Sequence, residues 1–160
     1  MNVQKKNKEK GFTIIEVVLV LAIAGLIFLM VFIALPALQR NQRDTQRKDD
    51  MGRVETAIQN YQSNNRNGLP TFGATFISQY LTVGGDAFSD PDGTAYVFKA
   101  GPVNLSTLTF DSTVADVYYT VGYVCDGTNT NTGLSSTAQG VGKVAIQYKL
   151  EGGGTYCVNN

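Results

Sequence analysis

The stretch KGFTIIEVVLVLAIAGLIFLMVFIALPAL, residues 10–38, decides the fold, because from Phe12 onward it is apolar enough to lie in lipid. An α-helix crosses the ~30 Å hydrocarbon layer of a membrane with about 20 apolar residues, and residues 12–38 exceed that length. One acidic side chain, Glu16, lies near the front of this run, where burying an unpaired charge costs several kcal/mol. The stretch therefore predicts a transmembrane helix with a carboxylate that needs a partner.

The segments on either side of the apolar run indicate that it is retained, but they do not orient it. Residues 1–10 are polar and carry four lysines against one glutamate. The sequence after the run, QRNQRDTQRKDD, has no small-residue cleavage site of the secretory kind, so we expect the apolar segment to stay in the protein. Four basic residues in this second flank equal the four lysines before the run, so the positive-inside rule assigns no orientation.

Composition narrows the classes of function. The 160 residues allow one modest domain beside the membrane segment. The chain contains no histidine, which excludes catalysis by histidine, and its 13 basic and 13 acidic residues argue against a general nucleic-acid binder. The sequence also contains no phosphate-binding loop motif and no cysteine–histidine zinc cluster. We therefore expect no enzyme activity and no cofactor.

The two cysteines, Cys125 and Cys157, lie far beyond the apolar run in a region rich in Gly, Thr, Asn and Tyr. A disulfide between them persists only in an oxidising, extracytoplasmic compartment. The alternative is two unpaired thiols buried in a sheet. We favour the disulfide, which predicts the leader inside the cell, the helix in the membrane and the remaining domain outside.

Beyond the membrane stretch, the pattern predicts that the helix continues and becomes amphipathic. Apolar residues recur at spacings of three and four and form one stripe: Met51, Val54, Ala57, Ile58 and Tyr61. Oppositely charged residues four apart are expected to pair and to solvate the exposed face: Arg40 with Asp44, Asp44 with Lys48, and Asp49 with Arg53. Stop signals at residues 64–70 end the helix, whereas Gly25 and Pro36 favour a kink or a local loss of helix in its first half.

Residues 67–160 predict a β-rich domain. Turn formers are dense at residues 90–93, and residues 74–82 fit a short helix. The strand candidates are rich in Val, Tyr, Thr and Ile and cover residues 95–100, 107–110, 115–125, 143–150 and 155–158. Alternation in the third candidate fits an antiparallel sheet with one packed face, which would cover the apolar stripe of the helix. The predicted fold class is therefore α+β, with a long polar loop at residues 125–142.

The front of the chain resembles a known signal. A basic leader ends in glycine and is followed by phenylalanine, threonine, two apolar residues, glutamate and an apolar run, in the string KGFTIIEVVLVLAIAG. This order is similar to the class III signal of type IV pilins and pseudopilins. The resemblance implies cleavage between Gly11 and Phe12 by a prepilin peptidase and methylation of the new amino group on Phe12. It also implies that Glu16 pairs with the amino terminus of a neighbouring subunit.

Other parts of the chain resemble the pilin pattern less closely. Gly25 falls where pilins commonly carry a glycine beside a melted stretch, whereas the usual proline would fall at Ile33 and this chain has Pro36. The two cysteines resemble the pair that closes a carboxy-terminal loop in pilins.

The string DPDGTAY, residues 90–96, is similar to a turn motif of pseudopilins and small pilins. Because pseudopilins bind calcium through oxygen ligands, the resemblance makes Asp86, Asp90 and Asp92 calcium candidates. These three aspartates lack the spacing of an EF-hand, and we expect no metal.

The resemblance implies four segments: a cleaved leader at residues 1–11, a transmembrane or filament-core helix at 12–38, an amphipathic helix at 39–66 and an extracytoplasmic head at 67–160. Such a subunit waits in the cytoplasmic membrane with its N-terminus inside. An assembly platform and its ATPase then polymerise it into a homopolymeric pilus on the cell surface, for motility, adhesion or DNA uptake. Nucleic acid is a partner only through filament function. Two alternatives are a pseudopilin of a type II secretion or competence system and a singly anchored membrane protein with a binding domain.

Overall fold

The computed structural model describes residues 11–104 and 107–160. Of the predicted leader, only Gly11 belongs to the described residues, and residues 1–10 lie outside them. The chain divides into two compact units, Met1–Leu38 and Gln39–Asn160.

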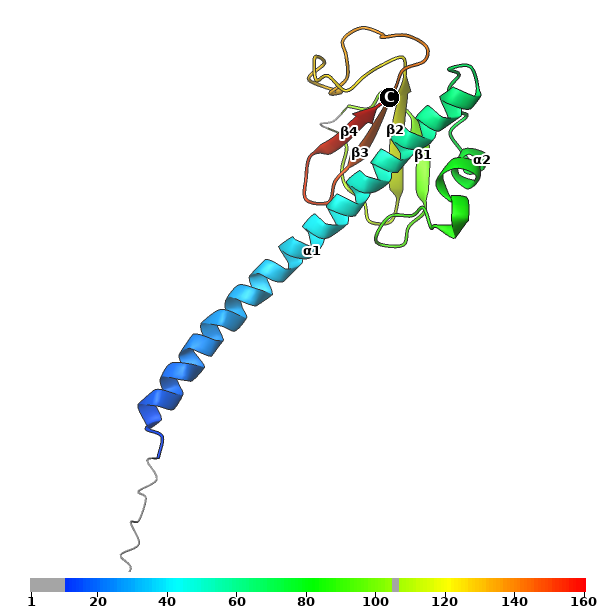
Figure 1. The fold of residues 1–160 in the computed structure, drawn as a ribbon. Coiled ribbons are helices and arrows are strands. Elements are labelled where there is room, and N and C mark those ends of the chain that lie inside the picture. The colour runs from blue at the N-terminus through cyan, green and yellow to red at the C-terminus, as the bar shows by residue number, and fades with distance from the viewer. Residues whose placement is uncertain (1–10, 105–106) are drawn as a thin grey trace, which may run out of the picture. The chain divides into compact units, whose positions relative to one another are not determined.

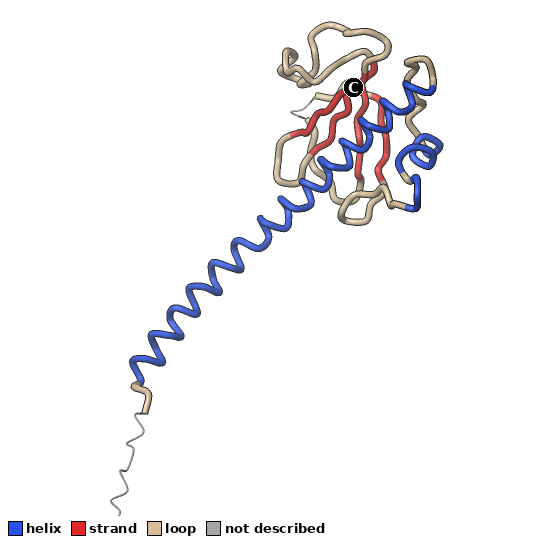
Figure 2. Tube along the Cα trace, in the orientation of Figure 1, coloured by secondary structure: helices blue, strands red, loops and turns tan. Residues whose placement is uncertain are grey.

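One long helix, α1 (Ile14–Asn64), contains residues of both units and has 51 residues (Figures 1 and 2). Its length follows from an apolar run that passes directly into an amphipathic pattern. It ends in the region of the predicted stop signals, where Arg66 and Asn67 adopt left-handed φ angles of 53° and 64°. The Asn67 N–H donates to the carbonyl of Gln62 at 2.9 Å, which satisfies one of the acceptors left open at the end of the helix.

Gly25 and Pro36 both lie inside α1, and the helix continues through them. The structure therefore shows no local loss of helix at either position. A proline inside a helix removes one backbone N–H, while the leucine, methionine and alanine residues around it favour helix. Any melting of this segment in an assembled filament stays a prediction.

The second unit contains a four-stranded sheet in the order β1-β2-β3-β4. Its strands are β1 (Tyr96–Ala100), β2 (Ala115–Val121), β3 (Val144–Lys149) and β4 (Thr155–Asn159). β2 and β3 are antiparallel, as are β3 and β4, but β1 runs parallel to β2. The prediction of a purely antiparallel sheet is wrong for this pair, because residues 101–114 form a connection long enough to return the chain to the same end of the sheet.

Two of the strand predictions need correction. Residues 107–110 form no strand, and Phe110 instead lies against the guanidinium of Arg47, 4.7 Å from its Cζ to the ring centroid. The third strand candidate ends at Val121 and not at Cys125. Gly122 follows with a φ of 85°, a left-handed conformation that turns the chain out of the strand.

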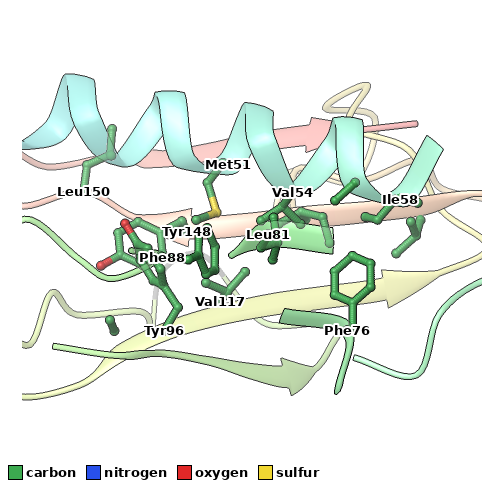
Figure 3. Close-up of a cluster of buried hydrophobic side chains, with 14 residues drawn as sticks. Met51, Val54, Ile58, Phe76, Leu81, Phe88, Tyr96, Val117, Tyr148 and Leu150 are labelled. Atoms are coloured by element: carbon green, nitrogen blue, oxygen red, sulfur yellow. The ribbon is translucent and has the colours of Figure 1, made fainter. Parts of the chain in front are cut away.

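The apolar stripe of α1 packs on one face of the sheet and forms the core, as predicted (Figure 3). Met51, Val54 and Ile58 are each at most 1% exposed. Two short segments also contribute to the core, α2 (Ala74–Phe76) and the π-helical turn η1 (Ile77–Leu81), and a 3₁₀ turn, η2 (Val83–Gly85), follows them. The other side of the core consists mainly of Phe76, Leu81, Phe88, Tyr96, Val117, Ile146 and Tyr148. The fold is thus α+β, with a mostly antiparallel sheet on the second half of the helix.

The long loop between β2 and β3 reaches the opposite face of the sheet. Side chains alternate along a strand, so Gln147, between the core residues Ile146 and Tyr148, points away from α1. The amide of Gln147 donates to the carbonyl of Thr132 in this loop at 2.6 Å. Leu134 is 1% exposed, so the loop that the sequence predicts as polar contains a buried apolar anchor.

A disulfide joins the same loop to the edge of the sheet. Cys125, shortly after β2, is bonded to Cys157 of β4, with 5.9 Å between their Cα atoms. The Cys125 N–H also donates to the side-chain oxygen of Asn159 at 3.0 Å. The pairing that the sequence favours is therefore present, and it connects the loop covalently to the last strand.

Ile58→Ala is expected to lower the free energy of unfolding by about 2–5 kcal/mol, because it leaves a cavity in the packed stripe. Equilibrium urea unfolding of the full chain in detergent, followed through its tyrosines, measures the change. Gln46→Ala, on an exposed position of α1, is the control and should change the value by less than about 0.5 kcal/mol. Equal unfolding midpoints for the two variants would contradict the core described above.

Candidate processing and assembly site

The expected cleavage point, between Gly11 and Phe12, lies just before α1 begins. Phe12 is 89% exposed, and no atom lies within 4 Å of the position that a side chain at Gly11 would take. Packing within the chain therefore does not require a glycine here. The peptide bond between Gly11 and Phe12 is exposed and therefore accessible to another protein. Recognition by a peptidase is the expected reason for a glycine at this position.

Glu16 has a partner within its own chain. Its Oε2 atom accepts hydrogen bonds from the backbone N–H of Thr13 (2.8 Å) and from the Thr13 hydroxyl (2.7 Å). The Glu16 N–H in turn donates to the Thr13 hydroxyl oxygen at 3.4 Å. This reciprocal arrangement is a capping box, which satisfies N–H groups left unpaired at the start of a helix. The Thr-x-x-Glu spacing of residues 13–16 is the signal for this motif in the sequence.

The capping box does not remove the need for a cation. Thr13 supplies hydrogen-bond donors but no positive charge, and both of its bonds end on Oε2 of Glu16. The second oxygen, Oε1, has no hydrogen-bond partner among the described residues. A carboxylate in a dry environment gains most from an opposite charge close by, so Glu16 is still open to a cation from outside the chain.

The apolar part of α1 is uncovered around its whole circumference. Every large apolar side chain between residues 12 and 38 is exposed, from 43% at Val31 to 89% at Phe12. Length and composition are sufficient for this helix to cross a membrane. Soluble monomers rarely expose apolar patches of more than a few hundred Å², so lipid or other protein chains must cover a surface of this kind.

A known sequence family matches the front part of the chain. Residues 6–32 match the family model described as the prokaryotic N-terminal methylation motif. The chain carries a type IV pilin-like class III signal peptide. The match includes Gly11, Phe12 and Glu16, and it ends within the apolar part of α1. No curated protein and no solved structure matches the chain.

The second unit, Gln39–Asn160, contains an ion cluster that no spacing in the sequence predicts. Arg47 was counted among the charges that flank the apolar run, but its side chain is fully buried. Its guanidinium donates to both carboxylate oxygens of Asp90, at 2.8 Å each, and through Nη1 to Asp44 (3.0 Å) and Glu151 (3.1 Å). With Phe110 against its face, Arg47 joins α1 to three separate loops of the head.

The ion pairs of the described residues include none of the expected four-apart pairs on α1: Arg40 with Asp44, Asp44 with Lys48, and Asp49 with Arg53. Asp44 instead turns into the head and accepts the backbone N–H groups of Glu151 (2.9 Å) and Gly152 (2.7 Å). Arg53 pairs with Asp50 at 3.1 Å. For Asp44, backbone donors in a distant turn and a buried guanidinium replace the predicted lysine, because they bind a carboxylate more strongly than an exposed lysine does. Arg53 keeps a local partner on α1, but three residues away and not four.

The cluster shifts the pKa values of its members. Burial by itself lowers the pKa of Arg47, but hydrogen bonds to its carboxylate partners outweigh that effect and raise the pKa above its usual value. Hydrogen bonds, chiefly from Arg43, lower the pKa of Glu151 from 4.5 to about 2. Burial raises the pKa of Asp90, and hydrogen bonds from Arg47 and Tyr148 bring it below the usual value. These groups therefore stay charged at neutral pH.

The three calcium candidates are not assembled into a metal site. Both oxygens of Asp90 are taken by Arg47, and Oδ2 also accepts the Tyr148 hydroxyl at 2.6 Å. The carboxylate of Asp92 accepts the N–H of Thr94 at 2.9 Å and so stabilises its own turn. Within the described residues, no three His, Cys, Asp or Glu side chains are grouped so that they could hold an ion. In this head the guanidinium of Arg47 is the cation that Asp90 binds.

Glu151→Gln should destabilise the head at neutral pH, and its effect should disappear in acid. The folded-state pKa of Glu151 lies below the ordinary 4.5, so the charged carboxylate stabilises the fold above the unfolded pKa, and this contribution is lost as the pH falls towards about 2. Urea unfolding of the full chain in detergent at about pH 7, about pH 4 and about pH 2.5 measures the difference between the variant and the wild type.

Glu55→Gln is the matched control for this experiment, because Glu55 is a glutamate on α1 that takes no part in the cluster. A difference between Glu151→Gln and the wild type that stays constant from neutral pH to about pH 2.5 would contradict the assigned pKa.

Proposed function

We propose that this chain is the structural subunit of a type IV pilus. It is cleaved between Gly11 and Phe12 and methylated on Phe12 by a prepilin peptidase, and then polymerised from the cytoplasmic membrane, where its N-terminus lies inside. The observation that carries the proposal is a class III signal joined directly to an apolar helix whose whole circumference is exposed. Neither feature by itself distinguishes a filament subunit from an ordinary anchored protein, but a leader cut at the very start of the apolar segment leaves that segment in place.

The exposed helix supports two successive environments for the subunit. Lipid covers residues 12–38 in the stored monomer, and the same residues of other copies cover them in a fibre. Transfer from lipid to a helix bundle keeps the apolar surface out of water, so the change needs no large hydrophobic cost. Identical subunits joined head to tail by contacts that do not close form an open helical filament.

Glu16 supports a specific register for that assembly. Its hydrogen bonds to Thr13 bring no positive charge, and cleavage creates an amino group at Phe12, at the front of each mature helix. Pairing the Glu16 carboxylate with the Phe12 amine of a neighbouring copy satisfies both charges in the dry core. A slip by one helical turn, about 5.4 Å, separates them and leaves two unpaired charges.

The charge of the mature chain argues against a general affinity for nucleic acid. Removal of residues 1–11 takes away four lysines and one glutamate, which leaves 9 basic and 12 acidic side chains. Non-specific binding of DNA depends on an excess of basic residues that displace counterions from phosphates. We therefore propose motility or adhesion as the main use of the filament, driven by an assembly platform and ATPase that this chain does not itself contain.

A pseudopilin of a secretion or competence system is the second candidate. The string at residues 90–96 resembles a turn motif of both pseudopilins and small pilins, and the turn is bound to α1 through Asp90 and Arg47, so it is compatible with either candidate. The abundance of the chain in fibres sheared from the cell surface separates the two candidates, because a major pilin dominates such fibres and a pseudopilin is scarce in them.

Gly11→Phe should block processing without disturbing the fold, because the position of a Gly11 side chain is open space. Intact mass measurement of the purified chain should show loss of residues 1–11 and gain of one methyl group in the wild type, and an unprocessed leader in the variant. Gly25→Ala is the control, since Gly25 also borders open space but lies away from the cleavage point. Normal maturation of Gly11→Phe would favour a singly anchored membrane protein instead.

Two substitutions at Glu16 separate its two roles. Glu16→Ala removes both the helix cap and the charge, whereas Glu16→Gln removes the charge and keeps a side-chain oxygen that can accept the hydrogen bonds from Thr13. If the charge sets the register, both variants should be processed normally and should yield few or no sheared fibres. Wild-type fibre yield from Glu16→Gln would show that the cap, and not the charge pair, is what assembly requires.

A further inference from the structure

The structure contains a polar cavity of about 370 Å³ at the end of α1. It lies between the helix, the turn that follows the helix, residues 139–143 and Asn160, which directly follows β4. Its size falls within the range of about 300–1,000 Å³ that is usual for small-molecule sites. Five of the side chains that line it are carboxamides: Gln59, Gln62, Asn67, Gln139 and Asn160. The other described lining residues are two glycines and Lys143, and none of the side chains in this set is acidic or large and apolar.

The floor of the cavity is held in place by hydrogen bonds within the head. Gln62 is 9% exposed, and its amide donates to the carbonyl of Gly142 at 2.7 Å. The side-chain amide of Asn160 donates to Gln62 Oε1 at 2.7 Å and to the same Gly142 carbonyl at 2.8 Å. These bonds tie α1, the loop before β3 and the end of the chain together. The cavity is therefore preformed, which reduces the entropy that a ligand would lose on ordering it.

The side chains at the rim of the cavity, Gln59, Gln139 and Asn67, carry unused hydrogen-bonding groups. Gln59 donates to Glu55 along its own helix, and Gln139 makes only long bonds to Thr137, of 3.3 and 3.5 Å. The Oε1 atoms of these two glutamines have no hydrogen-bond partner in the described part of the chain, and neither has the side chain of Asn67. Rim acceptors and donors therefore face solvent next to a rigid polar floor.

Two features restrict the shape of the rim. Asn67 holds a left-handed φ of 64°, a conformation that asparagine tolerates better than most residues. Gly142 lies so close to Asn67 that an added Cβ would come within 2.7 Å of its amide nitrogen. Glycine at this position therefore lets the loop approach the turn and leaves the Asn67 amide at the mouth of the cavity.

We propose that this cavity binds a carbohydrate. A sugar hydroxyl both donates and accepts hydrogen bonds, and a carboxamide presents an acceptor and two donors in one plane, so the two groups complement each other without a net charge. Among the described residues that line the cavity, Lys143 alone has a charged side chain, and it already donates to the backbone oxygen of Asn160 at 2.9 Å. A neutral sugar therefore fits the site better than a phosphate or another strongly anionic ligand. The proposal concerns the head alone and does not depend on assembly of a filament.

Saturation-transfer NMR of the full chain in detergent micelles tests the proposal with a panel of neutral and acidic mono- and disaccharides. At least one neutral sugar should bind saturably. Gln59→Ala and Gln139→Ala should each weaken that binding by roughly tenfold, the loss expected when one or two hydrogen bonds are removed. Both positions are exposed, so neither variant should disturb the fold, which the urea midpoint verifies.

Gln46→Ala, the same substitution on an exposed position of α1 outside the cavity, should bind like the wild type. Lys143→Gln should leave binding of the neutral sugar within about twofold of the wild type, because Lys143 already donates to Asn160. Tighter binding of an acidic than of a neutral sugar, lost in Lys143→Gln, would overturn the proposal of a neutral ligand. Absence of saturable binding across the panel would overturn the proposal. Binding that persists unchanged when Gln59→Ala and Gln139→Ala are combined would overturn it as well.

Discussion

The rest of this protein depends on the constraint that one helix must be covered in two different ways. Residues 12–38 of α1 are apolar on every side and exposed, while the later part of the same helix has a single apolar stripe that the sheet buries. A helix that is apolar all round is stable only inside lipid or among other helices. The second half can fold against its own chain, whereas the first half depends on a membrane or on other copies.

Arg47 connects the second half of α1 to the rest of the unit by polar contacts, in addition to the apolar packing of the helix on the sheet. Its buried guanidinium binds Asp44 on α1 itself and two loop residues, Asp90 before β1 and Glu151 between β3 and β4. A buried charge without partners costs several kcal/mol, so each of these loops must take its place for the cluster to form. The ion cluster therefore adds specificity to a core whose apolar contacts alone would tolerate shifts of the loops. The disulfide between Cys125 and Cys157 plays a similar part for the loop on the far face of the sheet.

Glu16 has one interaction in the single chain and, under the proposed function, a second one in the assembled filament. In the single chain, its carboxylate caps the start of α1 through Thr13 and so lowers the cost of holding a charge near lipid. The cap leaves the charge itself unbalanced, and under the proposed function the amine exposed by cleavage balances it in the next subunit. Under that proposal, the residue that caps the helix in the single chain also selects the register during assembly.

Local periodicity and composition are enough to predict the long helix and its apolar and amphipathic halves. The residues around Gly11 resemble a class III signal, and the sequence favoured a disulfide over two free thiols, which the structure then confirmed. It also predicted the strands that became β1 to β4, since each is rich in β-branched and aromatic residues. Only the tertiary structure decided that β1 runs parallel to β2, that residues 107–110 leave the sheet, and that Arg47 is buried among carboxylates. Apart from Asp44 on the same helix, the carboxylates that Arg47 binds, Asp90 and Glu151, lie 43 and 104 residues away along the chain, and no helical or strand period brings such distant side chains together.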